Sequence, residues 1–239
     1  MALQKLKCVC GEFSSKSWAV VNKIPIVECT CGVRRVESVD ANEYTALYAS
    51  GQYHTTGSED LPHDPDSLNL HRAAHRQRFT DDVEIAKKRL LKLTRYVQSG
   101  RVLIDVGCAN GAFMDVALSV FDECYGVDLS SDAVPDKLRD RVRVGELRTL
   151  GFQRRYADVI TFNDSFEHFI SPLPALKAAC GILKRDGILV VEIPDMGSKD
   201  AIEQGQNFKH VKPHEHLWYF TATQLRELLE SNGFTVVGM

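Results

Sequence analysis

The run from Val102 to Phe113 constrains the fold most strongly, because an apolar stretch passes into a glycine-containing segment and then into a helix-like pattern. Within it, Asp105, Gly107 and Gly111 form the pattern Asp-x-Gly-x-x-x-Gly. Glycine lets the backbone approach a ligand closely, and the helix that follows presents unpaired N–H groups. The run therefore predicts a buried parallel strand, a ligand-binding turn and a helix.

A second acid narrows the choice of ligand. Asp128 ends the next predicted strand, where a carboxylate can accept hydrogen bonds from two ribose hydroxyls. A dinucleotide fingerprint would be Gly-x-Gly-x-x-Gly around a pyrophosphate. Asp105 instead stands two residues ahead of the first glycine, where its charge repels a pyrophosphate and attracts an ammonium group. A nicotinamide site and a turn that only packs helix on strand are the alternatives.

Strand-like and helix-like segments alternate through the rest of the chain. Repeated strand–helix units predict an α/β fold with a doubly wound, mainly parallel sheet. A helix over 81–97 precedes them, and the polar segment 38–82 is expected to be irregular. Strands are expected over 101–106, 124–127, 141–144, 158–162, 187–193 and 234–237, and helices over 112–121, 132–138, 173–182 and 222–232.

The glycine pattern and its two acids resemble the S-adenosylmethionine site of class I methyltransferases. The resemblance implies a Rossmann-like methyltransferase fold, S-adenosylmethionine as cofactor and a seventh, antiparallel strand, whereas this sequence stops at its predicted sixth. It also implies the residues that line the cofactor. These are Asp105, Gly107, Cys108, Ala109, Gly111, Asp128, Leu129, Asn163, Asp164 and Ser165.

Four cysteines near the N-terminus form two copies of Cys-x-Cys-Gly, with strand-like segments at 18–21 and 24–27 between them. Two cysteine-bearing turns joined by a hairpin predict a small zinc-ribbon-like module in which Cys8, Cys10, Cys29 and Cys31 bind a structural Zn²⁺. Free or weakly redox-active thiols are the alternative, because zinc knuckles usually have the wider Cys-x-x-Cys spacing.

The other three cysteines, Cys108, Cys124 and Cys180, lie in apolar segments and are expected to be buried. Three domains follow from this pattern. They are a zinc-ribbon-like module over 1–37, a lid or linker with a leading helix over 38–98, and the methyltransferase domain over 99–239.

Two histidine-containing segments are the candidates for acid–base chemistry. The first follows the strand 158–162 and ends in Glu167-His168. The second contains His210, His214, Glu215 and His216, and leads into a helix that Thr221 is expected to cap together with Gln224. Neighbouring side chains in this loop alternate in direction, so a complete metal cage from the loop alone is not expected. His168 is either a general base or a residue that fixes its loop.

The cysteine pairs, the segment from Glu43 to Tyr53 and the Glu-His loop together resemble methyltransferases with an N-terminal zinc module, a group that includes sugar-nucleotide C-methyltransferases. The resemblance implies C- or O-methylation of a small, sugar-like or natural-product-like acceptor. It makes His168 and His216 the base candidates, assigns Glu215 to substrate binding or orientation, and makes Tyr53 a cover over the site.

Composition limits the other function classes. The net charge of −3 gives no broad phosphate-binding face, and nucleic acid is not the expected partner. The sequence has neither a membrane-spanning apolar run nor a secretory signal, so a cytoplasmic protein without a membrane partner is expected. Two readings compete with the small-molecule enzyme: a catalytically silent, methyltransferase-like binding protein in a larger assembly, and an RNA methyltransferase. The oligomeric state stays open.

Overall fold

The computed structural model describes residues 3–50, 65–97 and 100–239, with the backbone alone for 65–78. The chain divides into two compact units that are interleaved in sequence. The core unit is Thr45–Asn163 with Gly181–Val191, and the cysteine unit is Met1–Tyr44, Asp164–Cys180 and Glu192–Met239. The domain boundaries predicted after residues 37 and 98 describe domains that are each continuous in sequence, and they stay a prediction.

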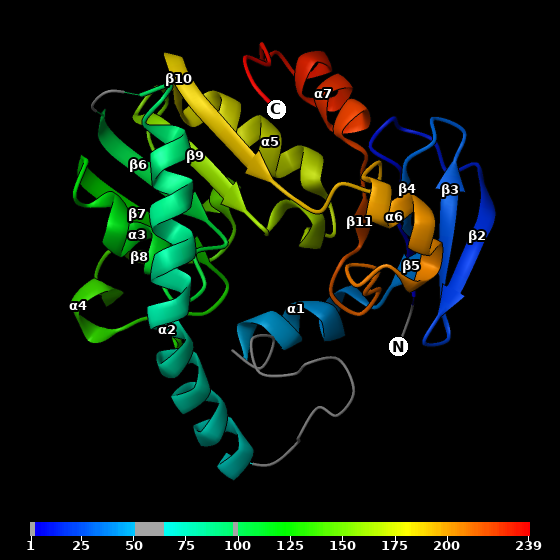
Figure 1. Ribbon diagram of the computed structural model, residues 1–239, viewed down its shortest axis with the longest axis horizontal. Coiled ribbons are helices and arrows are strands. Elements are labelled where there is room, and N and C mark those ends of the chain that lie inside the picture. Colours follow the sequence, from blue (N-terminus) through cyan, green and yellow to red (C-terminus); the bar gives the residue numbers. More distant parts are fainter. Residues whose placement is uncertain (1–2, 51–64, 98–99) are drawn as a thin grey trace. The chain divides into compact units, whose positions relative to one another are not determined.

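A five-stranded sheet forms the centre of the core unit, in the order β10-β9-β6-β7-β8. β6 pairs in parallel with both β7 and β9, and β7 pairs in parallel with β8. In Figure 1, β9 and β10 also run in the same direction. The predicted doubly wound, mainly parallel sheet of a Rossmann-like fold is therefore confirmed. The strands are β6 (Gly100–Val106), β7 (Phe121–Asp128), β8 (Val142–Val144), β9 (Ala157–Asn163) and β10 (Leu183–Glu192).

Helices α2 (Pro65–Leu93) and α3 (Ala112–Ala117) pack together beside this sheet, and the short α4 (Asp136–Arg139) follows β7 (Figure 1). Apolar side chains of α2, at Ala86, Leu90 and Leu93, join those of α3 and of the strands in one buried cluster. The helical periodicity from residue 81 onward arises from this packing, because the apolar stripe of α2 is its buried side.

Gly126 in β7 allows the chain to pack tightly beneath the glycine turn. A side-chain carbon at this position would lie 2.4 Å from Met114 Sδ and 2.5 Å from Cys108 Sγ. Contacts that short are not tolerated, so only glycine lets α3 and the turn after β6 close onto β7. The same feature places the thiol of Cys108, which is 4 % exposed, in the core rather than toward a ligand.

The cysteine unit contains a four-stranded sheet in the order β11-β4-β3-β2, antiparallel throughout. The predicted hairpin between the cysteine turns is confirmed as β2 (Ser15–Val21) and β3 (Ile24–Cys29), and β4 (Arg34–Val36) continues the sheet. The fourth strand, β11 (Trp218–Tyr219), comes from far along the chain and pairs with Arg34 and Arg35. A two-stranded ladder of β1 (Gln4–Lys5) and β5 (Ser38–Val39) lies in the same unit.

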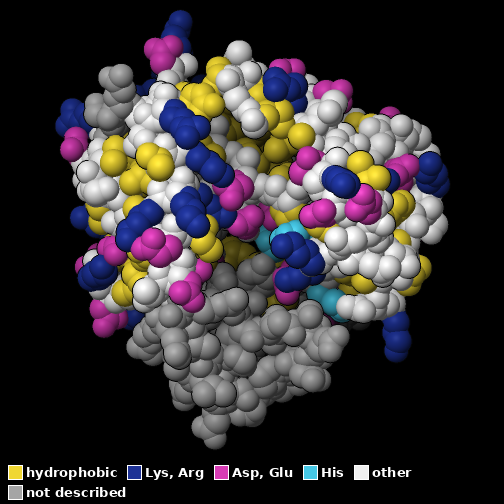
Figure 2. Space-filling view, viewed as in Figure 1, with side chains coloured by type: hydrophobic (Ala, Val, Ile, Leu, Met, Phe, Trp, Pro, Cys, Tyr) yellow, Lys and Arg dark blue, Asp and Glu magenta, His cyan; other side chains and the backbone are white. Residues whose placement is uncertain are grey.

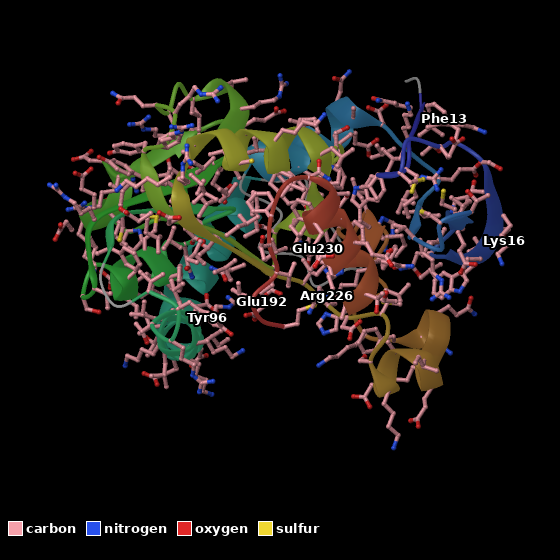
Figure 3. The ribbon with its side chains drawn as sticks, turned by 90° about the horizontal axis from the view of Figure 1, so that it is seen from above. Phe13, Lys16, Tyr96, Glu192, Arg226 and Glu230 are labelled. Carbon is pink, nitrogen blue, oxygen red and sulfur yellow. The ribbon has the colours of Figure 1, made fainter. Side chains whose placement is uncertain are left out.

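The helices of the remaining segments are α5 (Pro172–Ile182), α6 (Lys199–Gln204) and α7 (Ala222–Ser231). The predicted cap of α7 is confirmed, because Thr221 and Gln224 form a reciprocal capping box. Asp195 adds a second cap that the sequence did not suggest, since its Oδ1 accepts from Ala222 N at 3.0 Å. On the exposed side of α7, Arg226 and Glu230 form an ion pair of 3.6 Å (Figure 3).

Five sequence expectations about local structure are wrong, and one of them is the helix over 132–138, which starts only at Asp136. The segment 38–82 contains the helix α1 (Ala41–Ala49) and the first part of α2 rather than irregular chain throughout. Helix α3 stops at Ala117, because Phe121 already pairs with Gly100 in the sheet. Residues 234–237 form no strand, since they pair with none of the described strands. Cys180 is exposed.

No helix among the described residues combines the length and the apolar character that crossing a membrane requires.

Candidate functional site

In the turn between β6 and α3, every second residue from Gly107 to Gly111 has a left-handed backbone conformation. Their φ angles are 78° at Gly107, 49° at Ala109 and 77° at Gly111. Backbone bonds from Gly107 N to Val127 O (2.7 Å) and from Gly111 N to Cys108 O (2.8 Å) fix the turn against β7. Ala109 takes a conformation that glycine adopts more easily, which explains why a glycine would suit the middle of this motif.

Asp105 lies at the end of β6, 2 % exposed, and two neighbours on β9 orient its carboxylate. Thr161 Oγ1 donates to Asp105 Oδ1 at 2.6 Å, and Asn163 Nδ2 donates to the same oxygen at 3.1 Å. Burial raises the pKa of Asp105 to about 6, although these two donors act in the opposite direction. A buried carboxylate of this kind gains from a cationic ligand. Asn163 therefore positions Asp105.

Asp128 holds the turn from the other side. Its Oδ2 accepts from Ala109 N at 2.9 Å, and its Oδ1 accepts from Ser130 N at 3.3 Å. Burial raises the pKa of Asp128, and the backbone donors at Ala109, Ser130 and Leu129 counteract part of that rise. Each carboxylate oxygen can accept more than one hydrogen bond, so Asp128 can bind hydroxyl groups while it fixes the turn.

Asn110 is a part of this site that the sequence interpretation missed. Its side chain, 4 % exposed, donates to Asp82 Oδ2 at 2.6 Å and accepts from Ala112 N at 3.1 Å. It thus ties the turn to α2 and accepts from the first backbone N–H of α3. Asparagine side chains often bond the backbone two residues further on, which is a signal for the second role, but the bond to a residue in α2 could not be read from the sequence.

A second group of polar side chains lies in the cysteine unit. Glu167 and His168 belong to the short 3₁₀ helix η3 (Phe166–His168), and Leu217 N donates to Glu167 O at 2.9 Å, which holds the loop before β11 against it. His216, 8 % exposed, has its imidazole ring 4.7 Å from that of His168, edge to face. The two predicted base candidates are therefore neighbours.

Backbone carbonyls fix both imidazoles. His168 Nδ1 lies 2.8 Å from Glu215 O, and His216 Nδ1 lies 2.8 Å from His210 O. Burial lowers the pKa of His168 to about 4, and burial together with His168 lowers the pKa of His216 to about 3. Both rings are consequently neutral at pH 7.

The remaining residues predicted to lie near the acceptor do not all join the pair of histidines. Glu215 is half-buried, its pKa is raised by burial, and its Oε2 lies 3.7 Å from Lys212 Nζ. Tyr44 contributes in a way the sequence did not suggest, because its hydroxyl lies 2.9 Å from His168 O and 2.6 Å from Glu215 O. Asp164 and Ser165 belong to the cysteine unit, and Tyr53 lies outside the described residues.

The four N-terminal cysteines come together as predicted. Their sulfur atoms all lie within 4.8 Å of one another, with Cys8 Sγ 3.6 Å from Cys31 Sγ and Cys10 Sγ 3.5 Å from Cys29 Sγ. Figure 3 shows sulfur atoms gathered among the N-terminal strands near Phe13. Four thiolates around one Zn²⁺ at 2.3 Å would be about 3.8 Å apart, so the cluster fits a tetrahedral ion.

The tight cysteine spacing has a structural explanation. In each copy of Cys-x-Cys-Gly the glycine N–H donates to the carbonyl of the first cysteine, at 2.9 Å from Gly11 to Cys8 and at 2.8 Å from Gly32 to Cys29. Both cysteines of a pair therefore lie on one closed turn. Burial raises the pKa of Cys8; for Cys29, burial acts in the same direction, but hydrogen bonds from Cys31 N–H and the other cysteines lower the pKa to about 6.

Comparison with known proteins identifies the family of the chain. A family model described as a methyltransferase domain matches residues 73–238. No curated protein matches the chain by sequence. Similar solved structures include the YcgJ protein of Bacillus subtilis, which is 19 % identical, with a TM-score of 0.53 over 64 % of this chain and 69 % of that one.

Two further structures share the fold. A SAM-dependent methyltransferase from Archaeoglobus fulgidus is 22 % identical, with a TM-score of 0.51 over 64 % of this chain and 69 % of that one. A possible histamine N-methyltransferase from Thermotoga maritima is 24 % identical, with a TM-score of 0.50 over 72 % of this chain and 77 % of that one. The prediction of a class I S-adenosylmethionine-dependent methyltransferase is confirmed, and the chain belongs to the methyltransferase-domain family.

Proposed function

We propose that the chain transfers a methyl group from S-adenosylmethionine to a small-molecule acceptor, at carbon or oxygen. The observation that carries the proposal is the turn after β6, where a buried carboxylate, a left-handed backbone turn and the carboxylate of Asp128 meet. The match to the methyltransferase-domain family supports the reaction. The small acceptor is inferred from the low net charge and from the neighbouring side chains of His168 and His216, called the histidine cluster below.

The residues of the turn suit the parts of this cofactor. Asp105 would attract the ammonium group, Asp128 would accept hydrogen bonds from the ribose hydroxyls, and the backbone of residues 107–111 would line the bound molecule. Bound S-adenosylmethionine supplies a methyl group on a sulfonium. The protein has to position the acceptor, exclude water and see that one proton is removed.

The acceptor-side groups are those of the histidine cluster. The Nε2 atoms of His168 and His216 keep their lone pairs, because the Nδ1 atom of each ring donates to a backbone carbonyl. Such nitrogens can take a proton from the acceptor, and they can also bind a metal ion. Glu215, with its pKa raised by burial, is proposed to bind or orient the acceptor, and Tyr53 keeps its proposed role as a cover.

A transfer assay tests the proposal. The purified chain would be incubated with S-adenosylmethionine that carries a labelled methyl group and with ketosugars, phenols or short RNAs in parallel. We expect label on a ketosugar or a phenol. Label on RNA alone would replace the small-molecule assignment, and tight cofactor binding without any transfer would favour the binding protein in a larger assembly.

The buried acid predicts a pH dependence of cofactor binding. Because the pKa of Asp105 is raised to about 6, the carboxylate loses its charge as the pH falls through 6, and affinity for S-adenosylmethionine should fall between pH 7.5 and pH 5. Calorimetric titrations at the two pH values measure this. In Asp105→Asn the affinity should be weak at both, and an unchanged affinity in wild type at pH 5 would contradict the assignment.

The same acid affects stability with the opposite sign. The folded pKa lies above the unfolded value, so the folded state binds more protons between about pH 4 and 6, and the contribution of Asp105 to stability falls as the pH rises through that window. Loss of cofactor affinity at pH 5 is therefore not a sign that Asp105 destabilises the fold there.

We also propose that Cys8, Cys10, Cys29 and Cys31 bind one structural Zn²⁺. The sulfur separations support this proposal, since thiols joined as disulfides would have sulfur atoms about 2.05 Å apart. With four thiolates the ion would have no open position, so its role would be to hold the turns together.

A further inference from the structure

Glu167, His168 and His216 bring three side chains of metal-binding type together within the cysteine unit. Their ligand atoms, one carboxylate oxygen and two imidazole nitrogens, all lie within 4.8 Å of one another, and all three residues are buried. His168 Nε2 lies 3.9 Å from Glu167 Oε1. That distance is too long for a hydrogen bond and is comparable to the separation of two ligands on one cation.

The imidazoles are held in the tautomer that binds metals. A carbonyl oxygen only accepts hydrogen bonds, so the Nδ1 atoms that lie 2.8 Å from Glu215 O and His210 O must carry the protons. In this tautomer the Nε2 atoms carry no proton, and the backbone of Asp164 also interacts with the His168 ring. Metal-binding histidines usually donate their other ring N–H to a carbonyl or a carboxylate in this way.

The backbone brings the ligands together without help from an ion. Leu217 N donates to Glu167 O at 2.9 Å, and His216 N donates to Lys212 O at 2.7 Å. The hydroxyl of Tyr44 reaches the carbonyls of both His168 and Glu215. Two segments that are distant in sequence are therefore fixed next to each other. Binding an ion would not require a further loss of conformational entropy to order them.

The space between the three ligand atoms suits a small cation. Three atoms within 4.8 Å of one another have a common point no more than about 2.8 Å from each, and zinc–ligand bonds of about 2.0–2.2 Å need only a small further inward movement of the side chains. Among the residues whose side chains are described, four are histidines, all in the cysteine unit, and Figure 2 shows histidine side chains beside Lys, Arg, Asp and Glu side chains on one face.

We propose that Glu167, His168 and His216 bind one divalent cation of the zinc or manganese type. Two imidazoles and one carboxylate form a ligand set that leaves coordination positions open for oxygen. An oxygen atom of the methyl acceptor takes one of these open positions, and this part of the proposal rests on the proposed function. A cation there lowers the pKa of a bound hydroxyl group, or of the C–H group beside a bound carbonyl. That proton passes to water, and the oxygen or that carbon then takes the methyl group from the sulfonium, which leaves as the thioether. The two imidazoles then act as ligands and not as proton acceptors.

Cobalt(II) is the probe, because its absorption reports the ligands as well as the binding. The full chain, first loaded with one equivalent of Zn²⁺, which the four thiolates bind most tightly, would be titrated with Co²⁺ alone. We expect one equivalent to bind with ligand-field bands of nitrogen and oxygen ligation and without the thiolate-to-cobalt charge-transfer band that ions at the cysteines would give. His216→Ala and Glu167→Gln should each weaken this binding by about tenfold or more.

His214→Ala is the matched control, since His214 is an exposed histidine of the same loop and should bind cobalt as wild type does. Circular dichroism verifies that each variant is folded. Wild type that binds no cobalt outside the thiolates at millimolar concentration would overturn the proposal, as would full binding by a folded His216→Ala. A direct histidine base and a purely structural histidine pair both predict these negative results.

The proposed function can fail separately. S-Adenosylmethionine binding would be measured by calorimetry on the same samples, before any cobalt is added. Cobalt binding without cofactor binding would leave the metal site standing and overturn the methyltransferase assignment. Cofactor binding without cobalt binding would support the methyltransferase assignment and overturn the metal site.

Discussion

Asp128→Ala is expected to weaken S-adenosylmethionine binding by about a hundredfold or more. Hydrogen bonds to a charged group contribute about 1.5–3 kcal/mol each, so losing two to the ribose corresponds to more than two factors of ten in affinity. The variant also loses the acceptor for Ala109 N, which fixes the turn. Calorimetric titration of the cofactor into the variant and into wild type measures the difference.

Two further variants separate binding from folding. Asp128→Asn can still accept a hydrogen bond from Ala109 N, so it should keep the turn and lose only part of the affinity. Asp122→Ala changes an exposed aspartate on the same strand, 73 % exposed at the side chain, and should bind as wild type does. Wild-type affinity in a folded Asp128→Ala would contradict the placement of the ribose at this carboxylate.

Cys10→Ser, or removal of zinc with a strong chelator, is expected to destabilise the cysteine unit by several kcal/mol. Structural zinc bound by four thiolates contributes a large part of the folding free energy of small metal-binding modules. The chain has two tryptophans, and both lie in the sheet of this unit, Trp18 in β2 and Trp218 in β11. Their fluorescence should therefore shift to longer wavelength, and urea unfolding should begin at lower concentration.

Cys180→Ser is the control for this experiment, because Cys180 is exposed and lies outside the cluster. It should leave both the zinc content and the fluorescence unchanged. A wild-type chain that contains no zinc after purification with zinc present, and whose fluorescence ignores the chelator, would show that the four cysteines are free thiols.

The sequence predicted the parts of the fold that depend on local pattern. The apolar run before Gly107 and the acid at Asp128 give the strand, turn and neighbouring strand in the positions where the structure has them. The repeated Cys-x-Cys-Gly turns likewise give the hairpin and the sulfur cluster. Thr221 and Gln224 predict a helix start because a capping box involves residues only three positions apart.

Features that depend on contacts between distant segments could not be predicted in the same way. The cap that Asp195 supplies to α7 and the bond from Asn110 to Asp82 join residues with no common local pattern. The strand predicted at 234–237 has the right composition, but composition does not show whether a neighbouring strand exists. His168 and His216 were both identified, yet the proximity of His216 to Glu167 and His168 depends on bonds between distant segments, such as that from Leu217 N to Glu167 O.

The pairing of β11 with β4 has a consequence for how the protein is made. A nascent chain leaves the ribosome N-terminus first, and domains generally fold as units while synthesis continues. The strand β4 pairs with β3 at once, but it acquires its second partner strand only after Trp218 and Tyr219 have been synthesised, when every strand of the core unit is already complete. We therefore expect one edge of the N-terminal sheet to stay unpaired until β11 has been synthesised. The loop before β11, which contains His216, should be among the last parts of the protein to reach its final conformation.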